Sequence, residues 1–139
     1  MSRHRAVGLV ATNRARSHFF LQQKDEHYEP HPLGYSFFGG AIEHDEDPAV
    51  ALERELREEL GKLADTFIDA DPSHVLTMEV PPHGFAFSLY EVVLPGSLSL
   101  LHGVEVLEGK RGAVIARGEV AHTPFIWGLE HVMERYLAG

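Results

Sequence analysis

The sequence predicts an α/β sandwich with a mixed central sheet. Short apolar or alternating segments recur along the chain, and this is the pattern of β-strands. Amphipathic helical segments interrupt the series once in the interior and once near the C-terminal end. Strands interleaved with helices indicate a sheet that is covered by helices. The length of 139 residues suits a single domain, residues 1–139, because two ordinary domains would need a longer chain.

The first part of the chain predicts strands separated by a loop. His4–Asn13 contains an apolar run and is expected to be a largely buried strand, and His18–Gln23 is a second strand after a polar turn. Gln22–Gly34 is polar and contains prolines, which favours a loop. Tyr35–Phe38 is expected to be a short aromatic strand that leads directly into Gly39–Gly40.

The clearest helix is Asp47–Leu60. Asp47 is a favourable N-cap residue, Pro48 suits the first helical position, and Gly61 suits the position after the last turn. Apolar residues recur along the segment at helical spacing and form a stripe that can pack on a sheet.

The second half of the chain predicts further short strands and a terminal helix. The strands are rich in apolar and β-branched residues, and they are Val75–Val80, Phe85–Leu94, Val104–Leu107 and Ala113–Ala116. The helix is Thr123–Leu137, and it opens with Thr123 as a cap followed by a proline.

Composition excludes several classes of protein. A net charge of −9 makes the chain a poor candidate for binding bulk nucleic acid, whose phosphate backbone requires a basic surface. No apolar run approaches the roughly 20 residues needed to cross a bilayer, so we expect no membrane partner. Without cysteine the chain has no disulfide, thiolate nucleophile or cysteine-type zinc site, and a cytoplasmic location is expected. A small phosphorylated ligand is still compatible with this acidity if divalent cations lie between the two sets of negative charge.

Three glutamates gather along one edge of the Asp47–Leu60 helix. Glu55, Glu58 and Glu59 stand at positions i, i+3 and i+4, so their carboxylates fall within an arc of about 100°. Such carboxylates repel one another, and Mg²⁺ or Mn²⁺ would turn this repulsion into binding, because both ions prefer oxygen ligands. Taken alone, a charged helix edge of this kind is more often a solvent-exposed face.

A longer pattern extends the observation beyond the helix. From Gly40 the chain runs GAIEHDEDPAVALERELREELGK, which resembles the Nudix box, G-x5-E-x7-R-E-U-x-E-E-x-G-U, where U is a bulky apolar residue. All seven fixed positions agree, and they are Gly40, Glu46, Arg54, Glu55, Glu58, Glu59 and Gly61. The last U position holds Lys62, which affects the exit of the helix and no metal ligand. The chain is therefore similar to Nudix hydrolases, and the resemblance implies their α/β/α sandwich with a mixed central sheet.

The resemblance also implies a metal site. Glu55, Glu58 and Glu59 would bind Mg²⁺ or Mn²⁺, with the main-chain carbonyl of Gly39 as a further ligand. The metals would lower the pKa of a water molecule, orient it and neutralise charge on the diphosphate oxygens.

Catalytic roles follow from the same resemblance. Glu46 and Arg54 would form an ion pair that fixes the loop before the helix against the helix itself. Glu58 or Glu59 is the first candidate for the general base that activates the attacking water.

Candidates outside the box are weaker. A further carboxylate often completes the site in this family, and of Glu105 and Glu108 we favour Glu108, because it precedes a glycine as in some Nudix enzymes. A solvent-exposed loop glutamate is an equally ordinary interpretation. Tyr28, His31 and Tyr35 are candidates for substrate binding, since binding residues often lie on loops beside a rigid site. The other histidines show no convergent metal-ligand spacing.

The implied reaction is Mg²⁺-dependent hydrolysis of a diphosphate linkage in a small nucleotide-like substrate. Nucleoside triphosphates, nucleotide sugars, ADP-ribose and dinucleoside polyphosphates all stay open, because fold-level analogy does not choose among them. One alternative is a Nudix-like module that binds a nucleotide without hydrolysing it, and another is an unrelated acidic protein. A homodimer is expected only from the general frequency of two-fold dimers.

Overall fold

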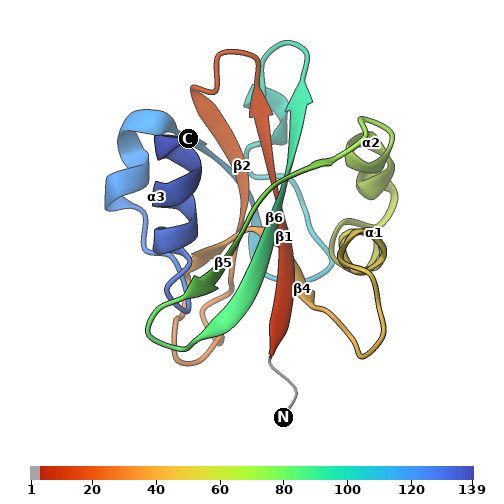
Figure 1. Ribbon diagram of the computed structural model, residues 1–139. Coiled ribbons are helices and arrows are strands. Elements are labelled where there is room, and N and C mark those ends of the chain that lie inside the picture. Colours follow the sequence, from red (N-terminus) through yellow and green to blue (C-terminus); the bar gives the residue numbers. More distant parts are fainter. Residues whose placement is uncertain (1–3) are drawn as a thin grey trace.

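The central sheet carries apolar side chains on both of its faces, and helices cover each face. The computed structural model describes residues 4–139. Figure 1 shows α1 (Pro48–Leu60) and α2 (Ala64–Ile68) on one side of the sheet and α3 (Glu130–Ala138) on the other. The predicted α/β/α sandwich is therefore confirmed.

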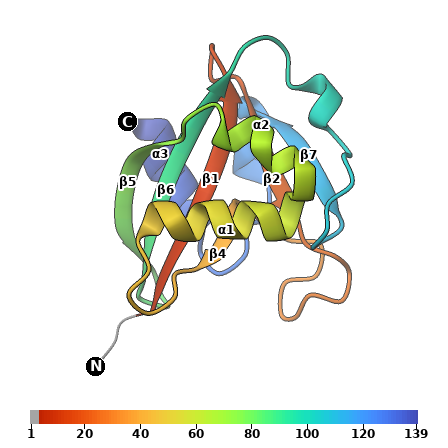
Figure 2. The same cartoon turned by 90° about the vertical axis from the view of Figure 1, so that its right-hand side faces the viewer.

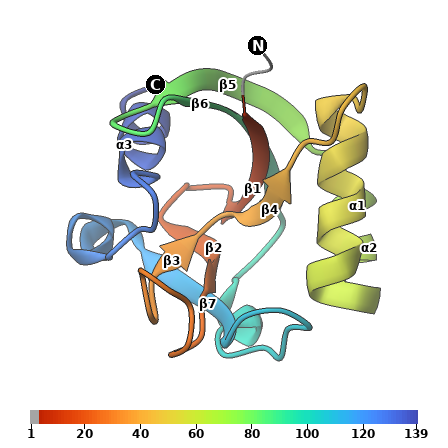
Figure 3. The same cartoon turned by 90° about the horizontal axis from the view of Figure 1, so that it is seen from below.

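The sheet is mixed, as predicted. β1 (Arg5–Asn13) and β6 (Phe85–Leu94) run parallel and side by side along the whole of β1. The other pairings between strands of the described chain are antiparallel, and they involve β2 (His18–Gln23), β3 (Tyr35–Ser36), β4 (Phe38–Ala41), β5 (Ser73–Val80) and β7 (Arg111–Ala116). The strand order is β3-β2-β1-β6-β5, with β4 paired to β1 and β7 paired to β2. Figure 3 shows how this sheet curves between α1 and α3.

The second edge of β1 is shared by two strands, which brings the Gly39–Gly40 pair into the sheet. β1 pairs with β2 through Ala11 and Thr12, and with β4 through residues 6–9. Gly39 lies opposite Gly8 with a φ of +151°, and a Cβ atom at Gly39 would stand 2.0 Å from the carbonyl oxygen of Val7. Only glycine fits this approach of the two main chains.

Helix α1 follows the predicted boundaries and crosses the strands of one sheet face (Figure 2). Asp47 has the extended main chain of an N-cap residue (ψ 144°), but its side chain makes no capping hydrogen bond. The start of the helix therefore depends on Pro48, whose fixed φ suits this position. Gly61 ends the helix with a φ of +58°.

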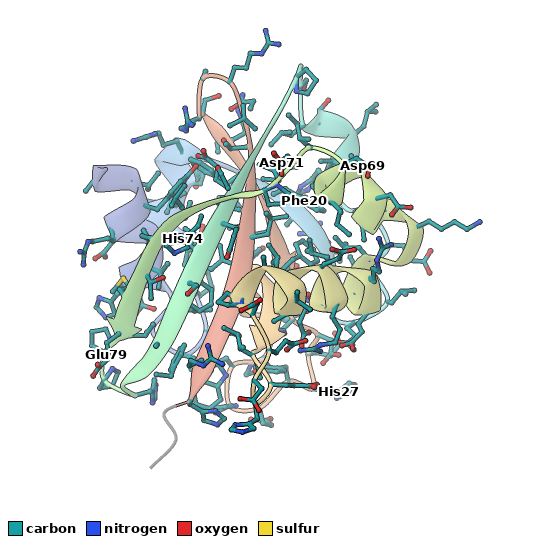
Figure 4. All side chains as sticks on the ribbon, turned by 45° about the vertical axis from the view of Figure 1, so that its right-hand side comes forward. Phe20, His27, Asp69, Asp71, His74 and Glu79 are labelled. Atoms are coloured by element: carbon teal, nitrogen blue, oxygen red, sulfur yellow. The ribbon has the colours of Figure 1, made fainter. Side chains whose placement is uncertain are left out.

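Each sheet face has its own apolar core, because alternate strand residues point to opposite faces. On β2, Phe20 points to the helices α1 and α2, where it stacks on Phe38 and Phe67 at ring distances of 5.0 and 5.5 Å (Figure 4). Its neighbour Phe19 points to the other face and belongs to the core under α3, together with Met133. The core under α1 and α2 includes Phe38 of β4 and Leu56 of α1, so it holds these two elements together beside the carboxylates described below.

Two predicted elements are wrong, and one strand is divided. The predicted strand Tyr35–Phe38 contains the whole of β3 and the first residue of β4, separated by Phe37. The predicted strand Val104–Leu107 is irregular, because its main-chain groups bond to several different segments. The N–H of Val104 donates to Leu101, and the N–H of Leu107 donates to Glu59 at 2.7 Å.

The predicted helix Thr123–Leu137 begins only at Glu130. Trp127 and Gly128 have positive φ angles of 51° and 82°, which a helix does not allow. The preceding residues instead extend the sheet region, since Tyr35 donates to Pro124 and accepts from Ile126 through its main chain. The short helix α2 and a 3-10 turn at Arg117–His122 were not predicted.

Candidate active site

Arg54 and Glu46 form a two-point ion pair. The Nε and Nη2 atoms of Arg54 lie 2.9 and 3.0 Å from the two carboxylate oxygens of Glu46. The hydrogen bonds from Arg54 lower the pKa of Glu46 to about 2. Arg54 also donates to the carbonyl of Ala41 at 3.1 Å. The guanidinium thus ties the end of β4 and the loop before α1 to the helix.

The third nitrogen of Arg54 faces the glutamates of α1. Its Nη1 atom lies 3.0 Å from Glu55 Oε1 and 3.4 Å from Glu58 Oε1. Glu58 is half-exposed, with 49% of its side chain accessible, whereas Glu55 is 14% exposed. The positive charge of Arg54 therefore offsets part of the repulsion between these carboxylates.

Glu55 packs directly on the glycine of β4. A Cβ atom at Gly40 would lie 2.6 Å from the Glu55 carboxyl carbon, so glycine is required for this contact. Burial raises the pKa of Glu55, with the negative charges of Glu58 and Glu108 acting in the same direction. The sequence at Gly40 thus creates the space in which a carboxylate of α1 lies against the sheet.

Glu59 is the most deeply buried carboxylate of the group, with 2% of the residue exposed. Its oxygens accept hydrogen bonds from the main-chain N–H of Gly39 at 2.8 Å and from Nε2 of Gln22 at 3.2 Å. Burial raises the pKa of Glu59 to about 8, against the opposing effect of Lys24. Without a cation, this carboxyl favours its protonated form at neutral pH.

Glu108 lies on the loop beside the C-terminal part of α1. Its main-chain carbonyl accepts a hydrogen bond from Gln22 Nε2 at 3.0 Å, and its exposed side chain raises the pKa of both Glu55 and Glu59. The carboxylate of Glu108 is therefore close enough to act on both. Glu105 is also exposed on this loop.

The donor set suits a hard divalent cation. Carboxylates from α1 and from the Glu108 loop repel one another, and oxygen ligands of this type are those that Mg²⁺ and Mn²⁺ prefer. Across residues 4–139, no three histidine, aspartate or glutamate side chains converge on one point as they are arranged. Binding an ion would therefore require Glu55 and Glu58 to turn away from Arg54.

A cavity of about 720 Å³ lies directly beside this group. Gly39 and Gly40 line it while also contacting the carboxyl groups of Glu59 and Glu55. The remaining wall is mainly aromatic and apolar, and it includes Tyr28, Phe37, Phe85, Phe87, Ile126 and Trp127. A larger hollow of about 780 Å³ lies between β5 and the end of α3, and none of the α1 glutamates lines it.

Trp127 organises the aromatic wall. Its indole N–H donates to the hydroxyl of Tyr28 at 2.9 Å, and the rings of His31 and His83 meet it edge-on at 4.9 and 5.3 Å. Lys24 lies over the ring of Tyr28, with its Nζ 4.9 Å from the ring centre. Lys24 thus connects the aromatic wall with the carboxylate group, where it acts on Glu59.

The structure brings together most of the residues that the sequence suggested. Tyr28 lines the cavity, and His31 contacts the cavity wall through Trp127. Tyr35 is half-buried in β3 and does not line the cavity. The sequence analysis did not identify Trp127 as a cavity residue. Its main chain has a positive φ, which the local sequence did not indicate. Three other residues, Gln22, Lys24 and His83, were also missed.

Comparison with known proteins decides the family. A family model described as the NUDIX domain matches residues 2–123, which is most of the chain. The chain belongs to the Nudix family. As a Nudix hydrolase it is an enzyme, a pyrophosphohydrolase acting on nucleotides, and the predicted family and enzyme class are confirmed. Nudix hydrolases generally use divalent metals and act on small nucleotide-like substrates.

Solved structures show the same fold at low sequence identity. One is a structure from a study of MutT from Aliivibrio salmonicida and Vibrio cholerae, at 20% identity and a TM-score of 0.69, covering 99% of this chain and 98% of that one. Another is a bifunctional NMN adenylyltransferase/ADP ribose pyrophosphatase from Francisella tularensis, at 18% identity and a TM-score of 0.70, covering 99% of this chain and 41% of that one. A third is the dihydroneopterin triphosphate pyrophosphohydrolase of E. coli, at 13% identity and a TM-score of 0.59, covering 95% and 93% of the two chains.

No curated protein gives a significant match to this sequence. Within residues 4–139, no helix has the length and apolar character needed to cross a membrane.

Proposed function

We propose that this Nudix hydrolase uses Mg²⁺ or Mn²⁺ to hydrolyse the diphosphate linkage of a nucleoside diphosphate derivative. One observation carries the proposal: Gly39 and Gly40 contact the carboxylates of Glu59 and Glu55 and also line the aromatic cavity. A substrate with a planar base at one end and a diphosphate at the other would place the base in the aromatic cavity and the diphosphate beside the carboxylates. We also propose, from the sequence, that the protein is cytoplasmic and forms a homodimer.

In this proposal the carboxylates bind the metal at the diphosphate, and Lys24 supplies a positive charge beside it. Glu55, Glu58 and Glu59 hold the metal together with the carbonyl of Gly39, and Glu108 completes the set. The bound metal lowers the pKa of the attacking water and neutralises charge on the diphosphate. Lys24 supplies a positive charge on the cavity side, where it contacts Tyr28 and lies near Glu59.

Arg54 and Glu46 act by holding the site together. Their two-point contact restrains the loop that joins β4 to α1, so the carbonyl of Gly39 and the glutamates keep a fixed separation. Ligand orientation of this kind depends on supporting hydrogen bonds outside the ligand set.

Glu58 is the better candidate for the general base. Both oxygens of Glu59 already accept hydrogen bonds, from Gly39 and Gln22, whereas Glu58 is half-exposed and bonded only through a 3.4 Å contact with Arg54. A base must reach the water that it deprotonates, and the freer side chain can do so.

The nucleoside end of the substrate is assigned to the cavity. A base can stack on aromatic side chains such as Tyr28 and Trp127, and each such contact is typically worth about 1–3 kcal/mol. The volume of about 720 Å³ lies within the usual range of small-ligand sites.

The test is product release from a panel of nucleoside triphosphates, nucleotide sugars, ADP-ribose and dinucleoside polyphosphates, each with Mg²⁺ or Mn²⁺. Wild type should turn over at least one member only with metal, and Glu58→Gln should reduce turnover by about 10²-fold or more. Glu53→Gln is the matched control on the same helix, because Glu53 pairs with Arg57 away from the site. Binding of a panel member without turnover would instead support a silent nucleotide-binding module.

A further inference from the structure

Gln22 is buried next to the carboxylate group and is incompletely hydrogen-bonded. Its side chain is fully buried on β2, outside the Nudix box. Among residues 4–139, its Oε1 atom is the only buried side-chain nitrogen or oxygen atom without a hydrogen-bond partner. Buried polar atoms are almost always paired, so this one calls for an explanation.

The amide nitrogen of Gln22 connects two parts of the site. Nε2 donates to Glu59 Oε2 at 3.2 Å and to the main-chain carbonyl of Glu108 at 3.0 Å. The opposite amide orientation would place Oε1 against the carbonyl of Glu108, which can only accept, so that bond would be lost. It would also lose the bond to Glu59 whenever that carboxyl is ionised. The amide is therefore held in the orientation that serves Glu59 and the Glu108 loop, and Oε1 is left unpaired as a result.

The side chain of Gln22 has opposing effects on stability. An apolar side chain of similar length would remove the unpaired oxygen, but it would also take the donor away from Glu59 and from the Glu108 carbonyl. Gln23, the next residue of β2, is the contrasting case. Its Nε2 donates to the carbonyl of Leu33 and its Oε1 accepts from Arg111 Nε at 2.9 Å, so both ends of its amide are used.

We infer that Gln22 is a positioning residue, which orients the carboxylate of Glu59 and holds the Glu108 loop beside it. The carboxylate of Glu59 is then fixed from two sides, by Gly39 on β4 and by Gln22 on β2. The same amide brings Glu108 toward the carboxylates of α1. This inference rests on the proposed metal-dependent hydrolysis, because it assigns Gln22 a role through two of the proposed metal ligands.

The experiment compares Gln22→Met with Gln23→Met, measuring kcat, KM, Mn²⁺ binding by electron paramagnetic resonance, and the melting temperature in chelator. For Gln22→Met we expect kcat and Mn²⁺ affinity to fall by about 10–100-fold, as is typical for residues that orient metal ligands, with KM changed less. The melting temperature in chelator should change little, because the loss of the unpaired oxygen offsets the loss of the two bonds. Gln23→Met should show the opposite pattern, with a lower melting temperature and unchanged kcat.

A double-mutant comparison tests whether Gln22 acts through Glu59. In a Glu59→Gln background, Gln22→Met should reduce Mn²⁺ affinity and kcat much less than in wild type, because residues in contact are not additive. A full additional loss in that background would overturn the inference, as would a Gln22→Met protein with wild-type Mn²⁺ affinity. If wild type hydrolyses no panel member but Gln22→Met still weakens Mn²⁺ binding, the proposed reaction fails while the role of Gln22 stands.

Discussion

Gly39 donates its main-chain N–H to the carboxylate of Glu59, 20 positions further along the chain, over 2.8 Å. This single contact joins β4 to the buried edge of α1. It depends on a main-chain conformation at Gly39, φ +151°, that other residues rarely adopt. The position of the most buried carboxylate in the site is therefore set by a glycine in the sheet.

Gly39→Ala should disrupt both the fold and the site. The added Cβ would meet the carbonyl oxygen of Val7 at 2.0 Å, so β4 would have to move away from β1. We expect a loss of about 3 kcal/mol or more in the free energy of unfolding, together with loss of turnover. Chemical denaturation measures the first and product release the second. Gly118→Ala is the control, since nothing lies within 4 Å of the added atom, and equal effects of the two substitutions would contradict the explanation.

Glu59→Gln should remove a pH-dependent loss of stability from the metal-free protein while it abolishes turnover. The pKa of Glu59 is raised from 4.5 in the unfolded chain to about 8 in the fold. Folding therefore takes up a proton between these values, and the stability of wild type falls as pH rises from about 4.5 to about 8. The variant lacks this titration, so its stability relative to wild type should rise by an amount on the order of a few kcal/mol between pH 4.5 and pH 8.

The measurement is the melting temperature of both proteins across this pH range in the presence of a chelator. Mg²⁺ or Mn²⁺ should raise the melting temperature of wild type, because a ligand that binds only the folded state stabilises it. The same addition should have less effect on Glu59→Gln. A difference in stability between the two proteins that does not change with pH in chelator would contradict this prediction.

Arg54→Lys should be damaging although the charge is kept. A lysine ammonium cannot make the paired contacts of 2.9 and 3.0 Å with Glu46 and also reach Glu55. We expect turnover to fall by about 10–100-fold and the free energy of unfolding to fall by about 1–3 kcal/mol. Arg57→Lys is the matched control on the same helix, since Arg57 pairs with half-exposed Glu53 and Asp65. Similar kinetic losses in the two variants would argue against the special role of Arg54.

The parts of the fold that were predicted correctly have strong local signals. The helix at Asp47–Leu60 has a proline at its start and a glycine at its end, and both residues do what their chemistry suggests. β2 and β6 have the predicted boundaries because runs of apolar and aromatic residues mark them. The errors lie where contacts distant in sequence decide the main chain. Residues 123–129 extend toward β3 instead of continuing a helix, because Tyr35 supplies partners for Pro124 and Ile126.

The candidate site divides in the same way. The glutamates of α1 share a helix edge, so their spacing alone brings them together. Gln22, Lys24 and Trp127 come from separate segments and meet the site only through the packing of the sheet. Alternation along β2 places Gln22 on the same face as Phe20, but the sequence does not show which face of the sheet α1 covers. The sequence could therefore predict the carboxylates but not the residues that orient them or line the cavity.

Glu91→Gln should reduce stability at neutral pH without changing turnover. Two hydrogen bonds of 2.8 Å from Arg16, together with one from the Tyr136 hydroxyl, lower the pKa of Glu91. Its contribution is thus present above the unfolded pKa of about 4.5 and is lost as pH falls through the lower folded value. We expect a loss of about 1–2 kcal/mol at pH 7 and a smaller difference near pH 3, measured by denaturation. A difference that grows on acidification would contradict the assignment.

Trp127→Ala should separate recognition of the base from cleavage of the diphosphate. Trp127 lines the cavity, donates a hydrogen bond to Tyr28 and contacts the rings of His31 and His83 edge-on. We expect kcat/KM for a nucleoside diphosphate derivative to fall by about 10–100-fold, equivalent to about 1–3 kcal/mol of stacking. A ribosyl diphosphate that lacks the base should be cleaved at the same rate by wild type and variant. Tyr35→Phe is the control, since Tyr35 does not line the cavity, and an equal loss for both substrates in Trp127→Ala would show that Trp127 supports the fold instead of the base.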